Sequence, residues 1–253
     1  MLVPWLKQFD LLIFDCIDST NDEAIRLLKA GVRGDFVIIA REQHKGKGQK
    51  GKTWQSINGN LHASILISSD LNFDRLKELS FLTAVAIRDA ILECIDYLKA
   101  PKANINLKWP NDVLIGDKKV AGILLESIRL DNKNYVIIGI GANTHFIPKM
   151  DGIKITSLLN EGIVLKNCDD FLSKVMDNFQ FYYDKWQLER DFSGIRKEWI
   201  KSAYNLNNSI ILNDGLKAIS GIFRGINQEG AICIELTNGE QLYFSSGEVS
   251  YLN

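Results

Sequence analysis

Q-H-K-G-K-G-Q-K-G-K-T-W, residues Gln43–Trp54, is the segment that most narrows the fold of this chain. Its three glycines, Gly46, Gly48 and Gly51, allow tight turns and can leave backbone N–H groups facing an anion. Four lysines, at positions 45, 47, 50 and 52, add positive charge to the same short loop. This composition favours a loop that binds phosphate.

The same segment matches two nucleotide-binding patterns, and its context disfavours both. G-x-x-x-x-G-K-T and G-x-G-x-x-G each begin at Gly46. Both patterns require a helix where the glycines end, because the helix N-terminus faces the phosphate. Here residues 53–60 are rich in turn formers, and residues 63–67 are strand-like. A P-loop or dinucleotide fold is therefore disfavoured, and a solvated lysine-rich loop remains the plain alternative to a phosphate site.

Outward from this loop, the chain alternates short apolar runs with helical patterns. Strands are predicted at residues 11–14, 36–40, 63–68 and 135–140. Residues 105–115 and 118–126 are expected to be two antiparallel strands, with Pro110 confined to a strand's start. Helices are predicted after a Thr20–Glu23 capping box, over 72–98 and over 169–186, with Phe192, Ile195 and Trp199 continuing the last apolar face. A mostly antiparallel sheet flanked by a few helices belongs to the α+β class.

The character of the chain changes after about Asn205. Short apolar runs now alternate with turn signals such as Asn238-Gly239. They predict five strands, at 210–212, 218–223, 231–236, 242–244 and 249–251, enough for a small barrel. We therefore expect two domains, residues 1–204 and residues 205–253.

Bulk properties exclude several classes of protein. A formal net charge of −1, with basic residues spread along the chain, does not predict a DNA-binding face. Cys16, Cys94, Cys168 and Cys233 lack the spacing of a zinc site or a disulfide framework and are expected to be reduced and mostly buried. The sequence also shows no signal-peptide pattern and no membrane-spanning run. These features predict a cytoplasmic protein that contacts no membrane.

Four separated motifs occur together in one known family. They are S-T-N at 19–21, the glycine segment, K-W-P-N-D-V-L at 108–114 followed by K-K-V-A-G-I-L-L-E at 118–126, and G-I-G-A-N at 139–143. In this order and spacing they resemble the biotin protein ligases, over essentially the whole chain. G-x-F-x-G-I-N at 221–227 and F-S-S-G-E-V-S at 244–250 resemble that family's small domain. The resemblance implies a class II synthetase-like, mixed and mostly antiparallel sheet with a C-terminal SH3-like β-barrel.

The resemblance implies a two-step reaction. Biotin and MgATP would give biotinyl-5′-adenylate and pyrophosphate, and a lysine of a biotin carboxyl carrier protein would then attack the mixed anhydride. That carrier would belong to acetyl-CoA carboxylase or a related carboxylase. ATP, Mg²⁺ and biotin would be substrates, and no tightly bound cofactor is expected. Lysines and backbone N–H groups suit the charge that builds on the α-phosphate, and a closing loop would keep water from the adenylate.

The resemblance also implies roles for individual residues. Lys119 and Lys47 would be catalytic, and Asp112 would help to place Mg²⁺. Biotin would be bound by Ser19, Thr20, Asn21, Gln43, Lys47, Gly48, Gln49, Lys119 and Gly122. ATP or the adenylate would be bound by Gly46, Gly48, Gly51, Trp54, Asn111, Asp112 and Asn143. The plain alternatives are a helix cap at Ser19–Asn21, an exposed turn lysine at Lys119 and an ordinary strand glycine at Gly122.

Two features depart from the family's pattern. The family's loop usually carries arginines, whereas this chain has lysines there and Gln49 where an arginine is common. Lysine lacks the bidentate fork of arginine and glutamine is neutral, so we expect a weaker hold on the adenylate. Some members also carry an N-terminal helix-turn-helix repressor domain, but the first catalytic strand here begins by Leu11. We therefore expect a ligase that does not bind DNA.

Several alternatives stay open at this stage. A lipoate or octanoate ligase has a related fold, although K-W-P-N-D favours biotin, and a non-catalytic biotin sensor would use a similar pocket. An exposed strand edge would allow a homodimer. His44, His62 and His145 receive no role and are expected at the surface or in local hydrogen bonds.

Overall fold

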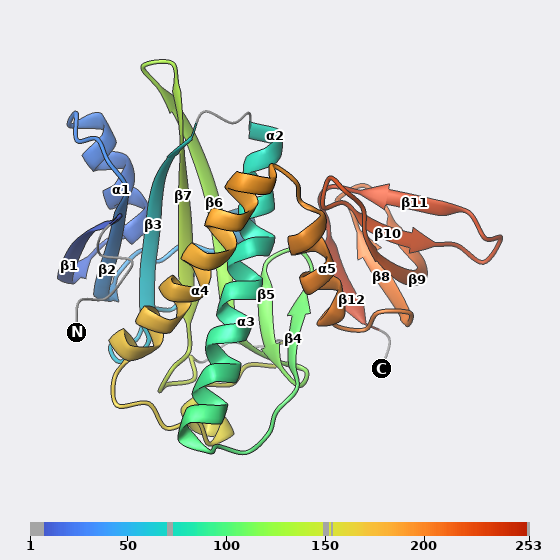
Figure 1. Ribbon diagram of the computed structural model, residues 1–253. Helices are drawn as coiled ribbons and strands as arrows, with labels where there is room; N and C mark the ends of the chain where they lie inside the picture. The colour runs from blue at the N-terminus through green and yellow to red at the C-terminus, as the bar shows by residue number, and fades with distance from the viewer. Residues whose placement is uncertain (1–7, 70–72, 149–151, 153, 252–253) are drawn as a thin grey trace.

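The computed structural model describes residues 8–69, 73–148, 152 and 154–251, and its backbone forms two sheets (Figure 1). The larger sheet has seven strands in the order β1-β2-β3-β7-β6-β5-β4. Its β1–β2 pair is parallel and its other five pairs are antiparallel. The smaller sheet has five antiparallel strands in the order β11-β10-β9-β8-β12. The predicted α+β class and the five C-terminal strands are confirmed.

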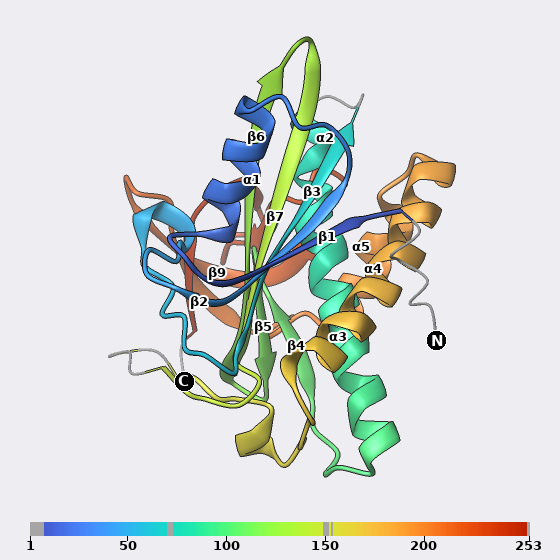
Figure 2. The same cartoon turned by 90° about the vertical axis from the view of Figure 1, so that its left-hand side faces the viewer.

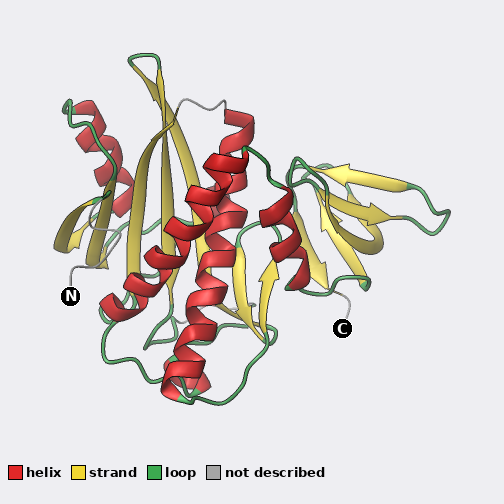
Figure 3. Ribbon diagram, in the orientation of Figure 1, coloured by secondary structure: helices red, strands yellow, loops and turns green. Residues whose placement is uncertain are grey.

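Figure 3 separates the helices from the strands. The large sheet consists of β1 (Asp10–Ile17), β2 (Phe36–Gln43), β3 (Leu61–Ser69), β4 (Ile105–Lys108), β5 (Asp112–Ile115), β6 (Lys118–Leu130) and β7 (Lys133–Ala142). The small sheet consists of β8 (Ser209–Asn213), β9 (Ala218–Ile226), β10 (Ile232–Glu235), β11 (Gln241–Phe244) and β12 (Glu248–Tyr251). The α-helices are α1 (Thr20–Lys29), α2 (Phe73–Leu76), α3 (Glu78–Leu98), α4 (Cys168–Glu189) and α5 (Ser193–Lys201). Two short 3₁₀ turns, η2 (Gln49–Gly51) and η3 (Leu159–Glu161), complete the described elements.

The large sheet is covered on both faces, with α1 on one side and α3 and α4 on the other (Figure 2). Alternation along β3 shows the two faces, because Ile65 and Ile67 join the core under α3 and α4 while Leu66 joins the core under α1. Ser64 also faces α1, where it hydrogen-bonds to Thr20 and Asn21. The α1 face is therefore the one on which polar side chains gather.

The small sheet packs against one end of the large sheet. Phe81 of α3 contacts Phe192 and Trp199 edge-on, with ring centroids 5.5 and 5.6 Å apart. Trp109 Nε1 donates a hydrogen bond to Gly230 O over 3.0 Å. Because buried residues of both sheets join one continuous core, the C-terminal strands stand in a defined position on the β4 side of the large sheet, next to α5 (Figure 1).

The start of α1 differs from the prediction. Ser19 is the N-cap, with φ −157° and its Oγ accepting from the Asp22 N–H, so Thr20 is already helical. The predicted Thr20–Glu23 capping box is therefore wrong, and Glu23 instead forms an ion pair with Arg26. Both residues of the Ser-Thr pair can cap a helix, and only the register of the first turn decides between them.

Residues 105–115 form two strands rather than the single strand predicted. β4 and β5 pair with each other in a register that opposes Lys108 to Asp112, so Pro110 lies in the turn between them and not at a strand's start. Proline has no N–H for the ladder, which explains why the strand ends there.

The helical pattern also divides differently. The run predicted over 72–98 is split into α2 and α3 at Lys77, and Asn72 lies outside the described residues. Phe192, Ile195 and Trp199 belong to a turn and a separate α5, because Arg190 adopts a left-handed φ of 49° after α4. None of the helices described is both long and apolar enough to cross a bilayer. The four cysteines are free, and all except Cys16 are buried, as predicted.

Candidate active site

Glycines on two neighbouring strands leave a flat area on the α1 face of the large sheet. Gly122 of β6 pairs with Gly141 of β7, and Gly139 lies two residues earlier on β7. A Cβ atom at Gly141 would lie 2.3 Å from the Trp54 ring, and one at Gly139 would lie 2.5 Å from Asn21 Oδ1. Side chains from α1 and from the glycine segment therefore rest directly on the backbone of the sheet.

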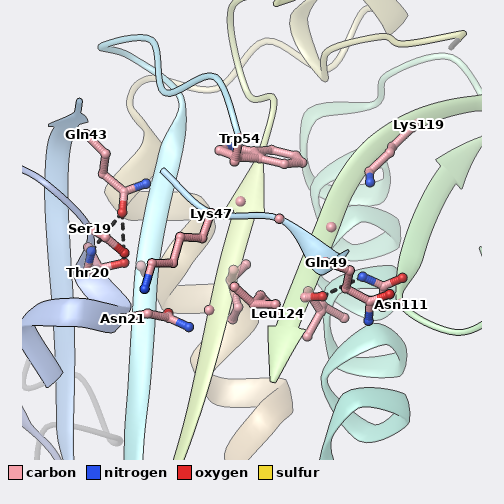
Figure 4. Close-up of a pocket in the computed structure, with 17 residues that line it drawn as sticks. Ser19, Thr20, Asn21, Gln43, Lys47, Gln49, Trp54, Asn111, Lys119 and Leu124 are labelled. Atoms are coloured by element: carbon pink, nitrogen blue, oxygen red, sulfur yellow. Dashed lines mark hydrogen bonds between the residues drawn. The ribbon is translucent and has the colours of Figure 1, made fainter. Parts of the chain in front are cut away.

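The start of α1 supplies buried, neutral hydrogen-bonding groups. Ser19, Thr20 and Asn21 are each 3% exposed or less. The Thr20 N–H donates to Gln43 Oε1 over 2.8 Å (Figure 4). Gln43 Nε2 donates to Ser56 Oγ over 2.9 Å. Because both ends of the Gln43 amide have partners, its orientation is fixed. The helix cap and the wall of a polar cavity are thus made by the same residues.

The glycine segment folds as a closed hairpin. The Trp54 N–H donates to Gly46 O over 2.9 Å, and the Gly48 N–H donates to Lys52 O over 2.7 Å. Gln49–Gly51 form a 3₁₀ turn at the tip, and the chain then passes into β3. No α-helix begins in this described segment, which excludes both helix-dependent nucleotide patterns. The Gly48 N–H is used within the hairpin and is not free to meet an anion in this structure.

Lys119 lies against the flat area and against an acidic partner. Its Nζ is 2.6 Å from Asp112 Oδ1 and 5.4 Å from the centroid of the Trp54 ring. A Cβ atom at Gly122 would lie 3.1 Å from Lys119 Nζ and equally close to Trp54. Gly122 is therefore no ordinary strand glycine, because a side chain there would crowd both residues.

Two lysines of the glycine segment are also paired with carboxylates. Lys47 contacts Asp22 in the first turn of α1, and this contact raises the pKa of Lys47. Lys52 Nζ is 2.7 Å from Glu248 Oε1 in β12, and the lysine lowers the pKa of Glu248. The segment is thus bridged to the large sheet's helix on one side and to the small sheet on the other.

Two adjoining cavities share a wall that includes Trp54 and Lys119. All nine residues predicted to bind biotin line the first cavity: Ser19, Thr20, Asn21, Gln43, Lys47, Gly48, Gln49, Lys119 and Gly122. Of the seven predicted to bind ATP or the adenylate, five line the second cavity: Gly48, Trp54, Asn111, Asp112 and Asn143. Gly46 and Gly51 line neither cavity. Their glycine character serves the hairpin, because a Cβ at Gly46 would lie 2.4 Å from Trp54 O and Gly51 has φ 75°.

Two buried polar atoms at these cavities have no hydrogen-bond partner among the described residues. They are Trp54 Nε1 and Asn143 Oδ1. Asn143 Nδ2 donates to Thr156 O over 3.1 Å, which directs the amide oxygen away from that carbonyl. Asn111 is by contrast engaged, since its Nδ2 donates to Ile123 O over 2.6 Å. Unpartnered buried polar atoms are unfavourable, so these two are suited to a ligand.

The sequence interpretation missed several residues of the cavity walls. Gly139 and Gly141 line the first cavity, and Lys108, Glu248 and Tyr251 line the second. Lys108 Nζ lies 5.1 Å from the Tyr251 ring centroid, and burial lowers the pKa of this lysine. Sequence features that could have identified three of these residues were present, because Lys108 opens K-W-P-N-D and the two glycines alternate within G-I-G-A-N.

Of the two positions predicted for the histidines, at the surface or in local hydrogen bonds, the structure excludes the first for His62. This residue is 1% exposed. Burial lowers its pKa to about 4, although its ring lies near the backbone of Ala40 and Arg41, which acts to raise the pKa. His44 is exposed and His145 Nδ1 lies 3.0 Å from Gly59 O, as the prediction allowed.

Comparison with known proteins shows which class this fold and these cavities define. Residues 13–143 match the model of the biotin/lipoate A/B protein ligase family, and residues 206–252 match that of the biotin protein ligase C-terminal domain. The chain therefore belongs to the biotin/lipoate A/B protein ligase family. Its C-terminal match places it, within that family, among the biotin protein ligases.

Relatives and solved structures agree with this placement. The chain is 33% identical over 235 residues to a biotin–acetyl-CoA-carboxylase ligase of Paracoccus denitrificans, covering 89% of this chain and 94% of the relative. It is 28% identical to the enzyme of the same name from Mycobacterium tuberculosis, covering 92% and 86%. The biotin protein ligase of Aquifex aeolicus in complex with biotin and ATP superposes with a TM-score of 0.79, at 26% identity, covering 95% of this chain and 97% of that chain.

Proposed function

We propose that this chain makes biotinyl-5′-AMP from biotin and MgATP and then transfers the biotinyl group to a lysine of a biotin carboxyl carrier protein. The observation that supports this most directly is the shared wall at Lys119 and Trp54. On one side of it the polar groups of the cavity wall are mostly neutral hydroxyls and amides, and on the other side the wall includes several lysines. A small carboxylic acid in the first cavity would meet a nucleotide phosphate in the second.

The first cavity suits the two chemical parts of biotin. Its cyclic urea has two N–H donors and a carbonyl acceptor, which the hydroxyl and amide groups of Ser19, Thr20 and Asn21 can match. Apolar contact for the fused ring and the chain is available from Trp54 and Leu124. A few placed polar groups within an apolar lining are typical of a small-molecule site.

The chemistry of the first step belongs at the shared wall. A carboxylate oxygen of biotin would attack the α-phosphorus, the bond from that phosphorus to the pyrophosphate oxygen would break, and pyrophosphate would leave. Negative charge grows on the phosphoryl oxygens during this step. Lys119, supported by Lys47, is placed to stabilise it. Since Lys119 is paired with Asp112 in this structure, the phosphate would have to share or replace that carboxylate.

In the second step the amine of the carrier lysine would attack the acyl carbon of the adenylate, and AMP would leave. This requires no covalent bond to the protein, in agreement with the lack of a Cys–His or Ser–His signature in the sequence. The hairpin tip at Gln49 lines both cavities, so it is suited to cover the anhydride until the carrier arrives.

Mg²⁺ would enter as part of the ATP complex. Asp112 fits a role in placing it, because its carboxylate lines the second cavity and carboxylate oxygens are the protein ligands that Mg²⁺ prefers. The described residues contain no group of three or more His, Cys, Asp or Glu able to hold a metal ion by themselves. Phosphate oxygens and water would therefore supply most of the ligands.

The remaining parts of the proposal concern partners and organisation. The carrier domain of an acetyl-CoA carboxylase is the proposed partner, because the relatives are named for that substrate. Catalysis is assigned to residues 1–204 and the small sheet to a domain of residues 205–253, consistent with the start of β8 at Ser209.

The edge strand β1 would allow a homodimer. A net charge of −1 supports the absence of DNA binding, and four free cysteines support a cytoplasmic location.

Exchange of labelled pyrophosphate into ATP tests the first step. We expect exchange with biotin and none without an added acid. Exchange with lipoate or octanoate alone would move the chain to the sister activity, and no exchange by the folded protein would leave only a binding function. Transfer is then tested with an isolated carrier domain and with its Lys→Arg variant at the acceptor position, which should remain unlabelled.

A further inference from the structure

We infer that Glu126 is a positioning residue that fixes the direction of a buried hydrogen-bond chain, so that the Thr20 hydroxyl offers an acceptor to the first cavity. The inference rests on the proposed function, because it takes the cyclic urea of biotin, with its two N–H donors, as the ligand there. Glu126 itself is half-buried on β6 and is not among the residues that line the cavity. It acts through Asn21 and Ser64.

The chain of hydrogen bonds crosses the sheet at a bare backbone position. Gly139 of β7 lies between Ser64 of β3 and Leu124 of β6 in the pairing register. The Asn21 side chain lies on this glycine, so it can reach Ser64 on one side and Glu126 on the other. Asn21 Nδ2 donates to Glu126 Oε2 over 2.6 Å, and Ser64 Oγ donates to Asn21 Oδ1 over 2.5 Å.

A carboxylate can only accept, and this determines the order of donors along the chain. The amide nitrogen of Asn21 must face Glu126, so its oxygen must face Ser64. Ser64 has a single hydroxyl proton, and that proton is needed by the Asn21 oxygen. The proton in the 2.7 Å contact between the Ser64 and Thr20 hydroxyls must then come from Thr20.

The order of donors determines which hydrogen-bonding group Thr20 presents to a ligand in the first cavity. Two acceptors compete for the Thr20 hydroxyl proton: Ser64 Oγ at 2.7 Å and Gln43 Oε1 at 3.2 Å, which already accepts from the Thr20 N–H. Because the 2.7 Å contact needs a proton between its two oxygens and Ser64 has used its own, the Thr20 proton goes to Ser64. The Thr20 oxygen therefore presents lone pairs to the cavity and accepts from a ring N–H. With the Asn21 amide reversed, Ser64 would accept from Nδ2 and donate to Thr20, and the Thr20 proton would turn toward Gln43 Oε1, 3.2 Å away, leaving the Thr20 oxygen one lone pair for the cavity instead of two.

The burial of the network makes its direction matter. Thr20 and Asn21 are 3% exposed and Ser64 is 0% exposed, so water cannot repair a mismatched pair. A hydrogen bond to a charged group is worth more than a neutral one, which explains why a carboxylate is suited to set the direction.

The test is the dissociation constant of biotin, measured by calorimetry, for wild type and three variants. Glu126→Leu removes the acceptor and should weaken biotin binding about ten-fold or more, while the KM for ATP in pyrophosphate exchange stays within about two-fold. Glu126→Gln keeps an oxygen acceptor and should restore binding to within about three-fold. Ser127→Ala, at the next and exposed position of β6, is the matched control and should bind as wild type does.

A double variant separates positioning from general loosening. Ser64→Ala interrupts the chain, so Glu126→Leu should have little additional effect in that background. Additive losses, equal binding by Glu126→Leu and wild type, or a parallel rise in the KM for ATP would overturn the inference. If the wild type binds no biotin, the proposed function fails and this inference with it; if only the Glu126 and Ser64 effects are missing, the proposed function stands.

Discussion

The two cavities that meet at Lys119 are built from different interactions. The first is held mainly by hydrogen bonds among the buried groups at the start of α1, and Ser64, which lies behind its wall, is fully buried. The wall of the second is a set of lysine–carboxylate pairs near the surface, such as Lys52 and Glu248, whose side chains are 55% and 61% exposed. Exposed ion pairs contribute little to stability and break easily, whereas a buried hydrogen-bond network holds one geometry. Under the proposed function, the molecule would combine a preorganised pocket for the acid with lysines that can leave their partners for phosphate.

The largest effect should follow from removing the residue that both cavities share. Lys119→Ala should lower biotin-dependent pyrophosphate exchange about 10²–10³-fold, the range seen when one charge-stabilising donor is lost. Lys118→Ala is the control, because that neighbour pairs with Glu161 and lines neither cavity. Equal losses in the two variants would show that the effect is structural and would remove Lys119 from the mechanism.

The stability of the buried core should respond to pH through His62, which lines neither cavity. Burial lowers its pKa to about 4, whereas an unfolded chain titrates near 6.5. Between these values the unfolded state binds more protons, so stability should fall as the pH decreases from 6.5 to 4. From pH 7 to pH 5 the contribution of His62 to this loss is about 2 kcal/mol.

Urea unfolding at the two pH values measures this effect. His62→Phe should lose about 2 kcal/mol less than wild type between pH 7 and pH 5, whatever its absolute stability. His44→Gln, at an exposed position, should keep the wild-type difference. Identical pH dependence in His62→Phe and wild type would mean that His62 does not remain neutral in the folded protein.

The same contrast explains what the sequence could predict. The residues of the first cavity could be predicted from the sequence, because Ser19–Asn21, Gln43 and Gly122 lie in ordered motifs whose spacing is fixed by strands and a helix start. Gly139 and Gly141 were overlooked within a motif already noticed, since their role as a bare surface depends on what lies over them. Glu248 and Tyr251 could not be assigned to this site from local pattern, because only the packing of the small sheet brings β12 beside the glycine segment.

A substitution at the tip of the glycine-segment hairpin should leave the fold intact and change the rate at which the adenylate is released. Gln49→Arg restores a charged, bidentate donor at a position that lines both cavities. We expect release of preformed biotinyl-5′-AMP to slow about ten-fold, corresponding to one charge-assisted hydrogen bond. Lys45→Arg, which adds the same fork outside the two cavities, should leave the release rate unchanged. Equal rates for Gln49→Arg and wild type would refute the weaker hold on the adenylate that the neutral tip predicts.

The smallest effect should come from breaking the ion pair between Lys52 and Glu248. The direction in which the KM for ATP changes distinguishes two roles for Lys52. If Lys52 serves phosphate, its pair with Glu248 competes with ATP, and Glu248→Gln should lower the KM for ATP about two-fold in low salt. Because exposed charges are screened, that difference should disappear at about 0.5 M salt. Glu235→Gln, which removes another paired carboxylate of the small sheet, should not change the KM. If instead the pair mainly holds the hairpin in place, Glu248→Gln should raise the KM, and the lysines of the second cavity would then be held in position by their partners rather than free to leave them.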